Sequence, residues 1–140
     1  MQVLVDTSVW SLALRRSARP SDPVGQATLA ALKDLIADAR AMMIGPVRQE
    51  LLSGIKDTAQ FNRVRDALAA FPDEPLTTQD FECAAQFFNV CKSQGIQGSH
   101  TDFLICAVAA RHKLPVFSLD QDFSHFQKCV PVVLFAVVQQ

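Results

Sequence analysis

Short apolar runs alternate with longer amphipathic segments along this 140-residue chain, and this alternation constrains the fold more than any other feature. The segment 103–110 is apolar on nearly every side, which indicates a buried central helix. Strands that alternate with helices in this way predict an α/β fold with a mainly parallel sheet between two helical layers. In such sheets, ligands bind beyond the carboxyl ends of the strands.

The expected elements follow from the apolar spacing and from the turn residues between them. Strands are expected at residues 2–5, 41–44, 75–77, 115–118 and 131–135. Helices are expected at residues 9–15, around 29–36, at 47–53, around 61–71, around 81–95 and at 102–112, with a short turn at 120–126. Thr101 is the expected N-cap of the helix that starts at Asp102.

Composition bounds the kind of protein. Apolar residues make up 49% and charged residues 19% of the chain, which is typical of a soluble globular protein, and residues 1–140 are expected to form one domain. The net charge is −1, so a nucleic-acid partner would be held by local rather than overall positive charge. No apolar run approaches the roughly 20 residues of a membrane span. With no signal-peptide pattern, a cytoplasmic location is expected.

Cysteine usage indicates reduced thiols. The four cysteines show no Cys-x-x-Cys spacing and lie in apolar contexts: Cys83, Cys91, Cys106 and Cys129. We therefore interpret them as small buried apolar residues rather than as zinc ligands or disulfides.

Five acidic residues differ from the others because of where they fall relative to the expected strands. Asp6 directly follows the first strand, and Asp120 and Asp122 directly follow the strand at 115–118. Asp102 opens the buried helix, and Glu50 lies in the helix after the second strand. Since the carboxyl ends of parallel strands share one edge of a sheet, these segments are expected to direct carboxylates toward one point.

Clustered carboxylates repel one another unless a cation neutralises them. Mg²⁺ prefers oxygen ligands and keeps several waters, so a few carboxylates suffice to hold it. One such ion, or a pair, activates water and stabilises the leaving oxygen of a phosphodiester. The chain contains no P-loop, no Gly-x-Ser-x-Gly elbow and no His/Cys dyad pattern that would favour other chemistry.

Each acid also has a purely structural interpretation, which the sequence leaves open. Asp6 and Asp120 can act only as helix caps, and Asp102 can be a first-turn acid favoured by the helix dipole. Glu50 can be an ordinary surface residue of a helix.

Four segments of the chain resemble the motifs of PIN-domain proteins, in the same order and at similar spacing. They are residues 3–10 (VLVDTSVW), 46–54 (PVRQELLSG), 101–107 (TDFLICA) and 114–123 (LPVFSLDQDF). Size and layout resemble most closely the VapC toxins of VapBC toxin–antitoxin modules.

The resemblance implies a three-layer α/β/α sandwich with a parallel, about five-stranded sheet. It implies Mg²⁺- or Mn²⁺-dependent cleavage of RNA, often by a homodimer, with an antitoxin that blocks the site. By matched position, the implied catalytic residues and metal ligands are Asp6, Glu50, Asp102 and Asp120, with Asp122 as a further ligand. The residues expected to support them by hydrogen bonds are Thr7, Ser8 and Thr101.

Basic and aromatic residues give less specific expectations. Arg15, Arg16 and Arg19 cluster after the first helix and Arg48 lies beside Glu50, so these arginines are candidates for RNA phosphate contacts or simply surface residues. His100 is interpreted as a loop residue without a role, and Trp10 is left unassigned. The loop at 16–23 separates two helices that can form a groove for the antitoxin, whose arginine would imitate the charge of the metal.

Three other classes of protein fit the sequence less well. A receiver-type signalling domain would need adjacent acids after the first strand and a lysine after the last strand, and neither is present. A catalytically inactive PIN-fold binding module is disfavoured by the complete set of acids. A relative of DNA flap nucleases would need additional helices for which the chain has no room.

Overall fold

The computed structural model describes residues 1–15 and 20–138 of the chain. In chain order the elements are β1 (Val3–Val5), α1 (Thr7–Leu14), α2 (Pro23–Ala37), β2 (Ala41–Met42), α3 (Gly45–Leu52), α4 (Thr58–Leu68), α5 (Thr78–Ser93), α6 (His100–His112), β3 (Val116–Phe117) and α7 (Asp122–Phe126). Strand–helix alternation is therefore confirmed.

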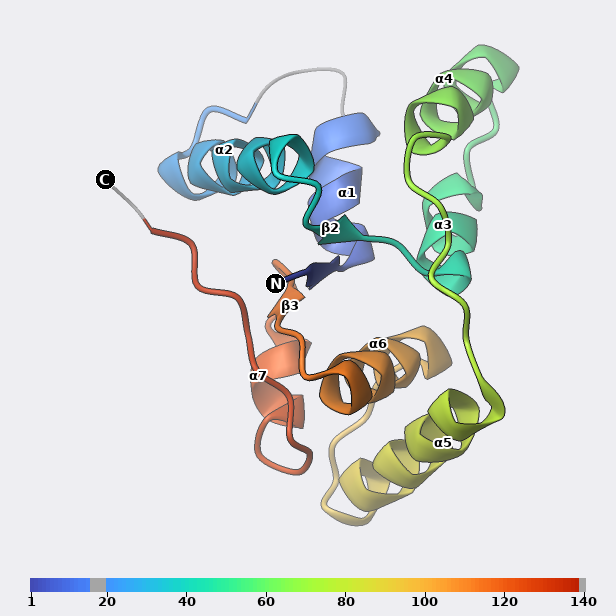
Figure 1. The fold of residues 1–140 in the computed structure, drawn as a ribbon, viewed down its shortest axis with the longest axis vertical. Helices are drawn as coiled ribbons and strands as arrows, with labels where there is room; N and C mark the ends of the chain where they lie inside the picture. Colours follow the sequence, from blue (N-terminus) through green and yellow to red (C-terminus); the bar gives the residue numbers. More distant parts are fainter. Residues whose placement is uncertain (16–19, 139–140) are drawn as a thin grey trace.

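The sheet has the order β2-β1-β3, and both strand pairs are parallel. Every residue of β1 is buried, since this strand lies in the centre with helices on both sides. Figure 1 shows α1 and α2 on one side of the sheet and α6, with α5 outside it, on the other. The register pairs Val5 with Phe117, so the residues that follow β1 and β3 emerge side by side.

Two outer segments extend the sheet by a single bridge each. Met43 pairs with Asp73, and Val116 pairs with Leu134, both in parallel. The expected strand at 75–77 was wrong, because the bridge lies at Asp73 and residues 75–77 form no strand. The expected strand at 131–135 is reduced to the bridge at Leu134. Both expected strands begin with prolines, which lack the N–H that a longer ladder requires. The parallel α/β sheet is confirmed, whereas a five-stranded sheet stays a prediction.

Helix α6 runs through the core, as its apolar sequence indicates: Phe103, Ile105 and Cys106 are all buried. Its N-cap is Ser99 and not Thr101, so the expected cap was wrong by two residues. Ser99 Oγ accepts from the backbone N–H of Asp102, and Asp102 Oδ2 accepts from the N–H of Ser99. This reciprocal capping box satisfies two backbone donors and starts the helix at His100.

The cysteines behave mainly as expected. All four are free thiols; Cys91 and Cys106 are buried, and Cys83 and Cys129 are half-buried. Burial raises the pKa of Cys91 to about 11, with a contribution from the neighbouring Cys129.

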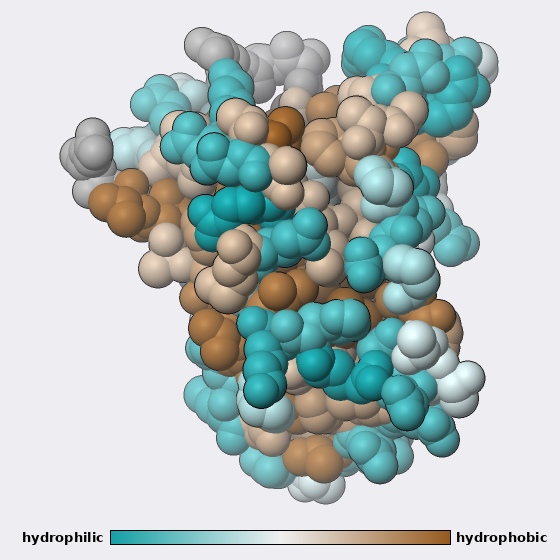
Figure 2. Space-filling view, in the orientation of Figure 1, coloured by the Kyte–Doolittle hydropathy of each residue, from teal (hydrophilic) through white to brown (hydrophobic). Residues whose placement is uncertain are grey.

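The C-terminal segment, red in Figure 1, runs along the outside of α7 and past α2. It leaves apolar side chains in solvent, with Val133 64% and Val138 82% exposed. In Figure 2, brown residues gather along this side, whereas hydrophilic residues cover much of the rest of the face. No helix in the described part of the chain is long and apolar enough to cross a membrane.

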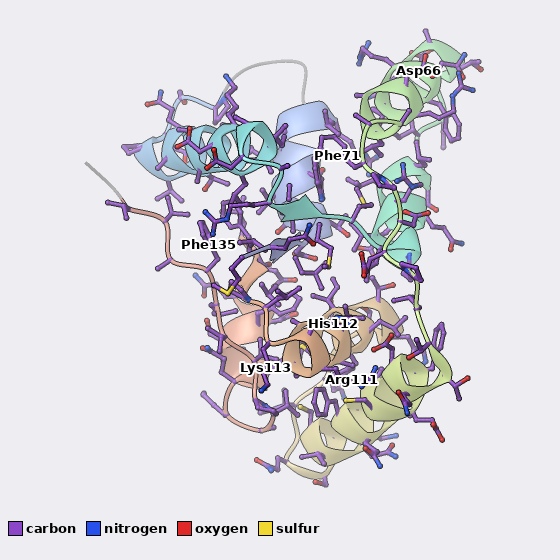
Figure 3. The ribbon with its side chains drawn as sticks, in the orientation of Figure 1. Asp66, Phe71, Arg111, His112, Lys113 and Phe135 are labelled. Carbon is purple, nitrogen blue, oxygen red and sulfur yellow. The ribbon has the colours of Figure 1, made fainter. Side chains whose placement is uncertain are left out.

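Helices α5 and α6 are joined at one end by a buried ion pair. Asp80 on α5 is fully buried and accepts from the guanidinium of Arg111, which Figure 3 labels near the C-terminal end of α6. Burial by itself raises the pKa of Asp80, but hydrogen bonds from Thr77 and Arg111 outweigh this effect and lower it. The pair therefore favours the ionised carboxylate in the folded state.

Arg111→Ala should lower the free energy of unfolding by about 1–3 kcal/mol at neutral pH, because it leaves a buried carboxylate short of a donor. Since the folded pKa of Asp80 is lowered, the contribution is complete above the ordinary aspartate pKa of about 4 and is lost as pH falls through the lowered value. Urea denaturation measures both effects.

Arg65→Ala is the matched control, because Arg65 pairs with Asp66 at the surface, where both side chains are more than half exposed. It should cost less than about 1 kcal/mol at any pH. Equal costs for the two variants would contradict the role given to Asp80.

Candidate functional site

Asp6 stands where β1 ends and α1 begins. Its backbone N–H donates to Phe117 O at 2.8 Å, and its side chain caps α1, as the motif indicates. The residue is only 4% exposed. An isolated buried carboxylate would be costly, so the hydrogen bonds that it accepts decide whether it stays ionised.

Two serine hydroxyls hold one oxygen of Asp6. Ser8 Oγ donates to Asp6 Oδ2 at 2.8 Å, and Ser118 Oγ donates to the same oxygen at 2.7 Å. No hydrogen bond within residues 1–15 and 20–138 reaches Oδ1, the other carboxylate oxygen. Asp6 is therefore fixed in orientation and keeps one oxygen for a ligand.

The same serines also order the turn after β3. Ser118 Oγ accepts from the backbone N–H of Asp120, and Ser8 Oγ accepts from that of Leu119, both at 2.9 Å. Asp120 Oδ1 in turn accepts from the N–H of Asp122 at 2.9 Å. Asp6 and the acidic turn after β3 thus belong to one hydrogen-bonded unit.

Asp102 lies close enough to Asp6 and Asp120 for their charges to affect its pKa. Burial raises the pKa of Asp102, the hydrogen bonds from Ser99 lower it, and the negative charges of Asp6 and Asp120 raise it again, leaving it above the ordinary value. Three of the expected segments therefore bring carboxylates within reach of each other's charge. Repulsion of this kind is what a divalent cation would relieve.

Glu50 and Asp122 are less firmly placed with respect to this group. Both are exposed; Glu50 lies on α3, which packs against α1, and Asp122 begins α7. No group of three or more His, Cys, Asp or Glu side chains stands ready to hold a metal ion in the part of the chain that the structure describes. The carboxylates nevertheless fit Mg²⁺ or Mn²⁺ in chemistry, since all their donor atoms are hard oxygens.

The supporting residues are only partly those expected. Ser8 hydrogen-bonds to Asp6, whereas Thr7 Oγ1 is buried without a partner among the described residues. Thr101 is half-buried, and no side-chain hydrogen bond is seen for it within the described ranges. Sequence reasoning missed Ser99 and Ser118. The signal for Ser99 was the Ser-x-x-Asp spacing before Asp102. Ser118 had no local signal, because the strand register places it beside Asp6.

Arg48 serves the fold, since its guanidinium pairs with groups at and after the end of α4. Arg48 donates to Asp73 Oδ1 at 2.9 Å and to the carbonyls of Leu68 and Phe71, so it joins α3 to the end of α4. We therefore base no RNA contact on it. Arg15 is the C-cap of α1, and Arg16 and Arg19 lie outside the described residues.

The structure shows where two aromatic residues lie that had no role in the sequence analysis. Trp10 is 1% exposed and packs against Phe71 with ring centroids 4.9 Å apart, so it belongs to the core. His100 is the first residue of α6 and not a loop residue, which corrects the sequence interpretation. Its ring stacks on Phe88.

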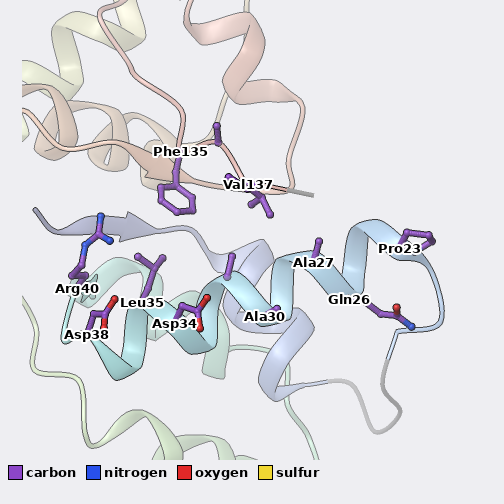
Figure 4. Close-up of a pocket in the computed structure, with 13 residues that line it drawn as sticks. Pro23, Gln26, Ala27, Ala30, Asp34, Leu35, Asp38, Arg40, Phe135 and Val137 are labelled. Carbon is purple, nitrogen blue, oxygen red and sulfur yellow. The ribbon is translucent and has the colours of Figure 1, made fainter. Parts of the chain in front are cut away.

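A groove of about 700 Å³ lies between α2 and the C-terminal segment. Figure 4 shows Asp34 and Asp38 on one wall and Phe135 and Val137 on the other. None of the five candidate acids lines it. Volume alone therefore does not locate the candidate site.

The profile of the PIN domain matches residues 3–128, which is most of the chain. The chain therefore belongs to the PIN-domain family, whose members are generally nucleases. The comparison with curated proteins found no match.

Solved structures agree with this assignment. The chain is similar to FitAcB from Neisseria gonorrhoeae at 22% identity, with a TM-score of 0.74 over 96% of this chain and 97% of that one. It is similar to VapBC-5, a member of the VapBC family of toxin–antitoxin systems from Mycobacterium tuberculosis, at 22% identity and a TM-score of 0.68 over 97% and 98%. VapBC2 from Rickettsia felis, bound to a promoter DNA fragment, matches at 15% identity and a TM-score of 0.73 over 96% and 98%. The fold is that of the PIN proteins of toxin–antitoxin systems.

Asp102→Asn should stabilise the metal-free protein at neutral pH. Because the folded pKa of Asp102 is raised, its ionised form costs stability as the pH rises through the ordinary and then the raised value. Asparagine removes this charge and still accepts from the N–H of Ser99. Thermal unfolding in EDTA should show the gain at pH 7 and none in acid.

Added Mn²⁺ should then raise the unfolding temperature of the wild type more than that of Asp102→Asn, because only binding to the folded state stabilises it. Asp57→Asn is the matched control, since Asp57 is the N-cap of α4 and keeps its cap as asparagine. A loss of stability in Asp102→Asn without metal would contradict the described electrostatics.

Proposed function

We propose that this protein is a metal-dependent endoribonuclease that uses Mg²⁺ or Mn²⁺ to hydrolyse RNA phosphodiester bonds. The proposal rests above all on the hydrogen-bonded unit in which Ser118 joins Asp6 to the turn that carries Asp120. The pKa of Asp102 is raised by burial and, in addition, by the charges of Asp6 and Asp120. Three segments of the chain supply these carboxylates at one edge of the sheet, and the chain belongs to a family of nucleases.

Asp6, Asp102 and Asp120 would be the main metal ligands, with Glu50 and Asp122 completing the set. When bound, the ion would lower the pKa of a water molecule and neutralise charge on the phosphodiester. Asp6 is held by two hydroxyls that both occupy Oδ2, so Oδ1 is free for the ion. Ser99 orients Asp102 through the capping box, and Ser118 orients the turn that carries Asp120.

RNA binding by this chain would depend on the ion and on local basic residues. With a net charge of −1, the chain offers no overall attraction for phosphate. Arg15 and Arg16 remain candidates for phosphate contacts beyond the end of α1.

We also propose that the protein is the toxin of a type II toxin–antitoxin pair and acts in the cytoplasm. The similar structures are of VapBC and other toxin–antitoxin systems, which supports a cognate antitoxin as partner. A homodimer, suggested by the family resemblance, belongs to the same proposal, as does a single domain over residues 1–140.

A catalytically inactive PIN-fold binding module is the remaining alternative. The serine-held Asp6 and the mutual repulsion around Asp102 argue against it, because a mere scaffold gains nothing from such a group. A receiver-type domain is wrong, since the chain belongs to the PIN-domain family.

Asp6→Asn should lower the rate of Mn²⁺-dependent RNA cleavage by roughly a hundredfold or more, because a ligand of an ion that supplies several kcal/mol of stabilisation is lost. Asparagine can still accept from Ser8 and Ser118, so the unfolding temperature should change little. EDTA should stop the wild-type reaction. Cleavage of a labelled RNA, followed by gel electrophoresis, measures each effect.

Asp34→Asn is the control, because Asp34 is an exposed carboxylate on α2 that lines only the groove of Figure 4. It should cleave like the wild type. RNA cleavage that persists in EDTA, or in a folded Asp6→Asn variant, would contradict the proposed metal-dependent mechanism.

Expression of the wild-type protein alone should arrest bacterial growth, while expression of Asp6→Asn to the same level should not. The reason is that growth arrest by a nuclease toxin requires cleavage and not only folding. Growth curves with immunoblots for expression measure this. Equal arrest by both proteins would separate toxicity from the acidic site.

A further inference from the structure

An exposed aromatic stack lies at the start of α6, the helix that carries Asp102. The rings of His100 and Phe88 lie nearly parallel, with centroids 5.3 Å apart and an interplanar angle of 21°. Phe88 is fixed from behind by the edge-on contact of Phe103, which is 1% exposed. The His100 ring is therefore held on its inner side, while the residue remains exposed to solvent.

The position of this stack relative to the acids is set by α6. His100 is the first residue of the helix, and Asp102 lies in the same first turn. A planar group that stacks on His100 would therefore lie at the same end of α6 as Asp102, although residues two apart in a helix direct their side chains to different sides. Figure 1 shows how the loop between α5 and α6 brings the end of one helix to the start of the other.

A groove of about 500 Å³ continues from the stack between α5 and α6. Its walls are Phe81, Ala84, Phe88, Asn89, His100 and Leu104, together with two further apolar residues. This volume falls within the range typical of ligand sites. Phe81 is 51% exposed, so a second aromatic face is also accessible along the groove.

A lysine lies beside the ring that supports His100. No acidic side chain is among the described residues that line it. The amino group of Lys92 lies 5.8 Å from the centroid of the Phe88 ring, one helical turn further along α5. A cation next to aromatic faces is the combination that single-stranded nucleic acids use, with bases on the rings and phosphates near the charge.

We propose that the His100–Phe88 stack is a subsite that holds one unpaired base of single-stranded RNA at the end of α6 that carries Asp102. This inference rests on the proposed ribonuclease function and names a part of the substrate that binds outside the acidic group. The base stacks on the outer face of His100, and the Asn89 amide is placed along the groove to meet a base edge. Because every base has a π face, the subsite selects unpaired RNA over helical RNA more than it selects a sequence.

The first test compares substitutions at His100 that differ in their π face. His100→Phe keeps an aromatic ring, whereas His100→Leu keeps apolar packing on Phe88 but offers no face for stacking. His100→Leu should raise the KM for cleavage of a short single-stranded RNA by roughly 5- to 100-fold, and His100→Phe should stay close to the wild type. The kcat should change less than KM, because the metal ligands are untouched.

His112→Leu is the matched control, because His112 is an exposed histidine at the opposite end of the same helix. It should leave KM and kcat unchanged. Thermal unfolding of all four proteins checks that they are folded, and the Phe/Leu comparison remains decisive even if Leu costs some stability.

The second test does not depend on cleavage. Fluorescence anisotropy in EDTA measures the Kd of a labelled single-stranded RNA in which one nucleotide at a time is abasic. One abasic position should weaken binding to the wild type by at least about fivefold and have no effect on His100→Leu, since the stacking contact is already lost.

The outcomes separate this inference from the proposed function. RNA cleavage by the wild type with equal KM and Kd for His100→Leu would overturn the base subsite and leave the nuclease intact. Failure of the wild type to cleave any RNA with Mn²⁺ would contradict the proposed nuclease activity. The anisotropy measurement would still test whether a base stacks on His100. A His100→Leu variant that changes from dimer to monomer by light scattering, with unchanged RNA affinity, would assign the groove to a second copy of the chain and overturn the subsite.

Discussion

The parallel pairing of β1 with β3 is the contact on which the rest of the site depends. Because Val5 pairs with Phe117, the next residues of the two strands, Asp6 and Ser118, emerge side by side. One hydrogen bond between them then ties the start of α1 to the acidic turn before α7. A slip of this register by one residue would turn Ser118 to the opposite face and leave Asp6 with half its support.

Repulsion between carboxylates destabilises the candidate site, and hydrogen bonds of the surrounding fold offset part of this cost. Asp102 carries a raised pKa because it is partly buried and faces two other carboxylates. The capping box with Ser99 offsets part of this cost by using the same carboxylate to start the central helix. At the other end of the α5–α6 pair, the buried contact with Arg111 lowers the pKa of Asp80 and so favours its ionised form. One helix pair thus combines a stabilising end with an end suited to a cation.

The α5–α6 pair also carries the proposed base subsite. The start of α6 carries both Asp102 and His100, so the position of the aromatic stack follows from the helix that positions the acid. The groove on this pair includes His100, whereas the larger groove along α2 includes no residue of α6.

The alternation of strands and helices, the buried α6 and the choice of candidate acids follow from the sequence, because apolar periodicity and strand-end positions are local properties. The sequence did not indicate that the outer bridge lies at Asp73, nor that Arg48 serves the fold. The contacts of Ser118 with Asp6 and of His100 with Phe88 come from the tertiary structure. These contacts join residues far apart in the chain, and their partners are fixed by strand register and helix packing, which no local pattern encodes.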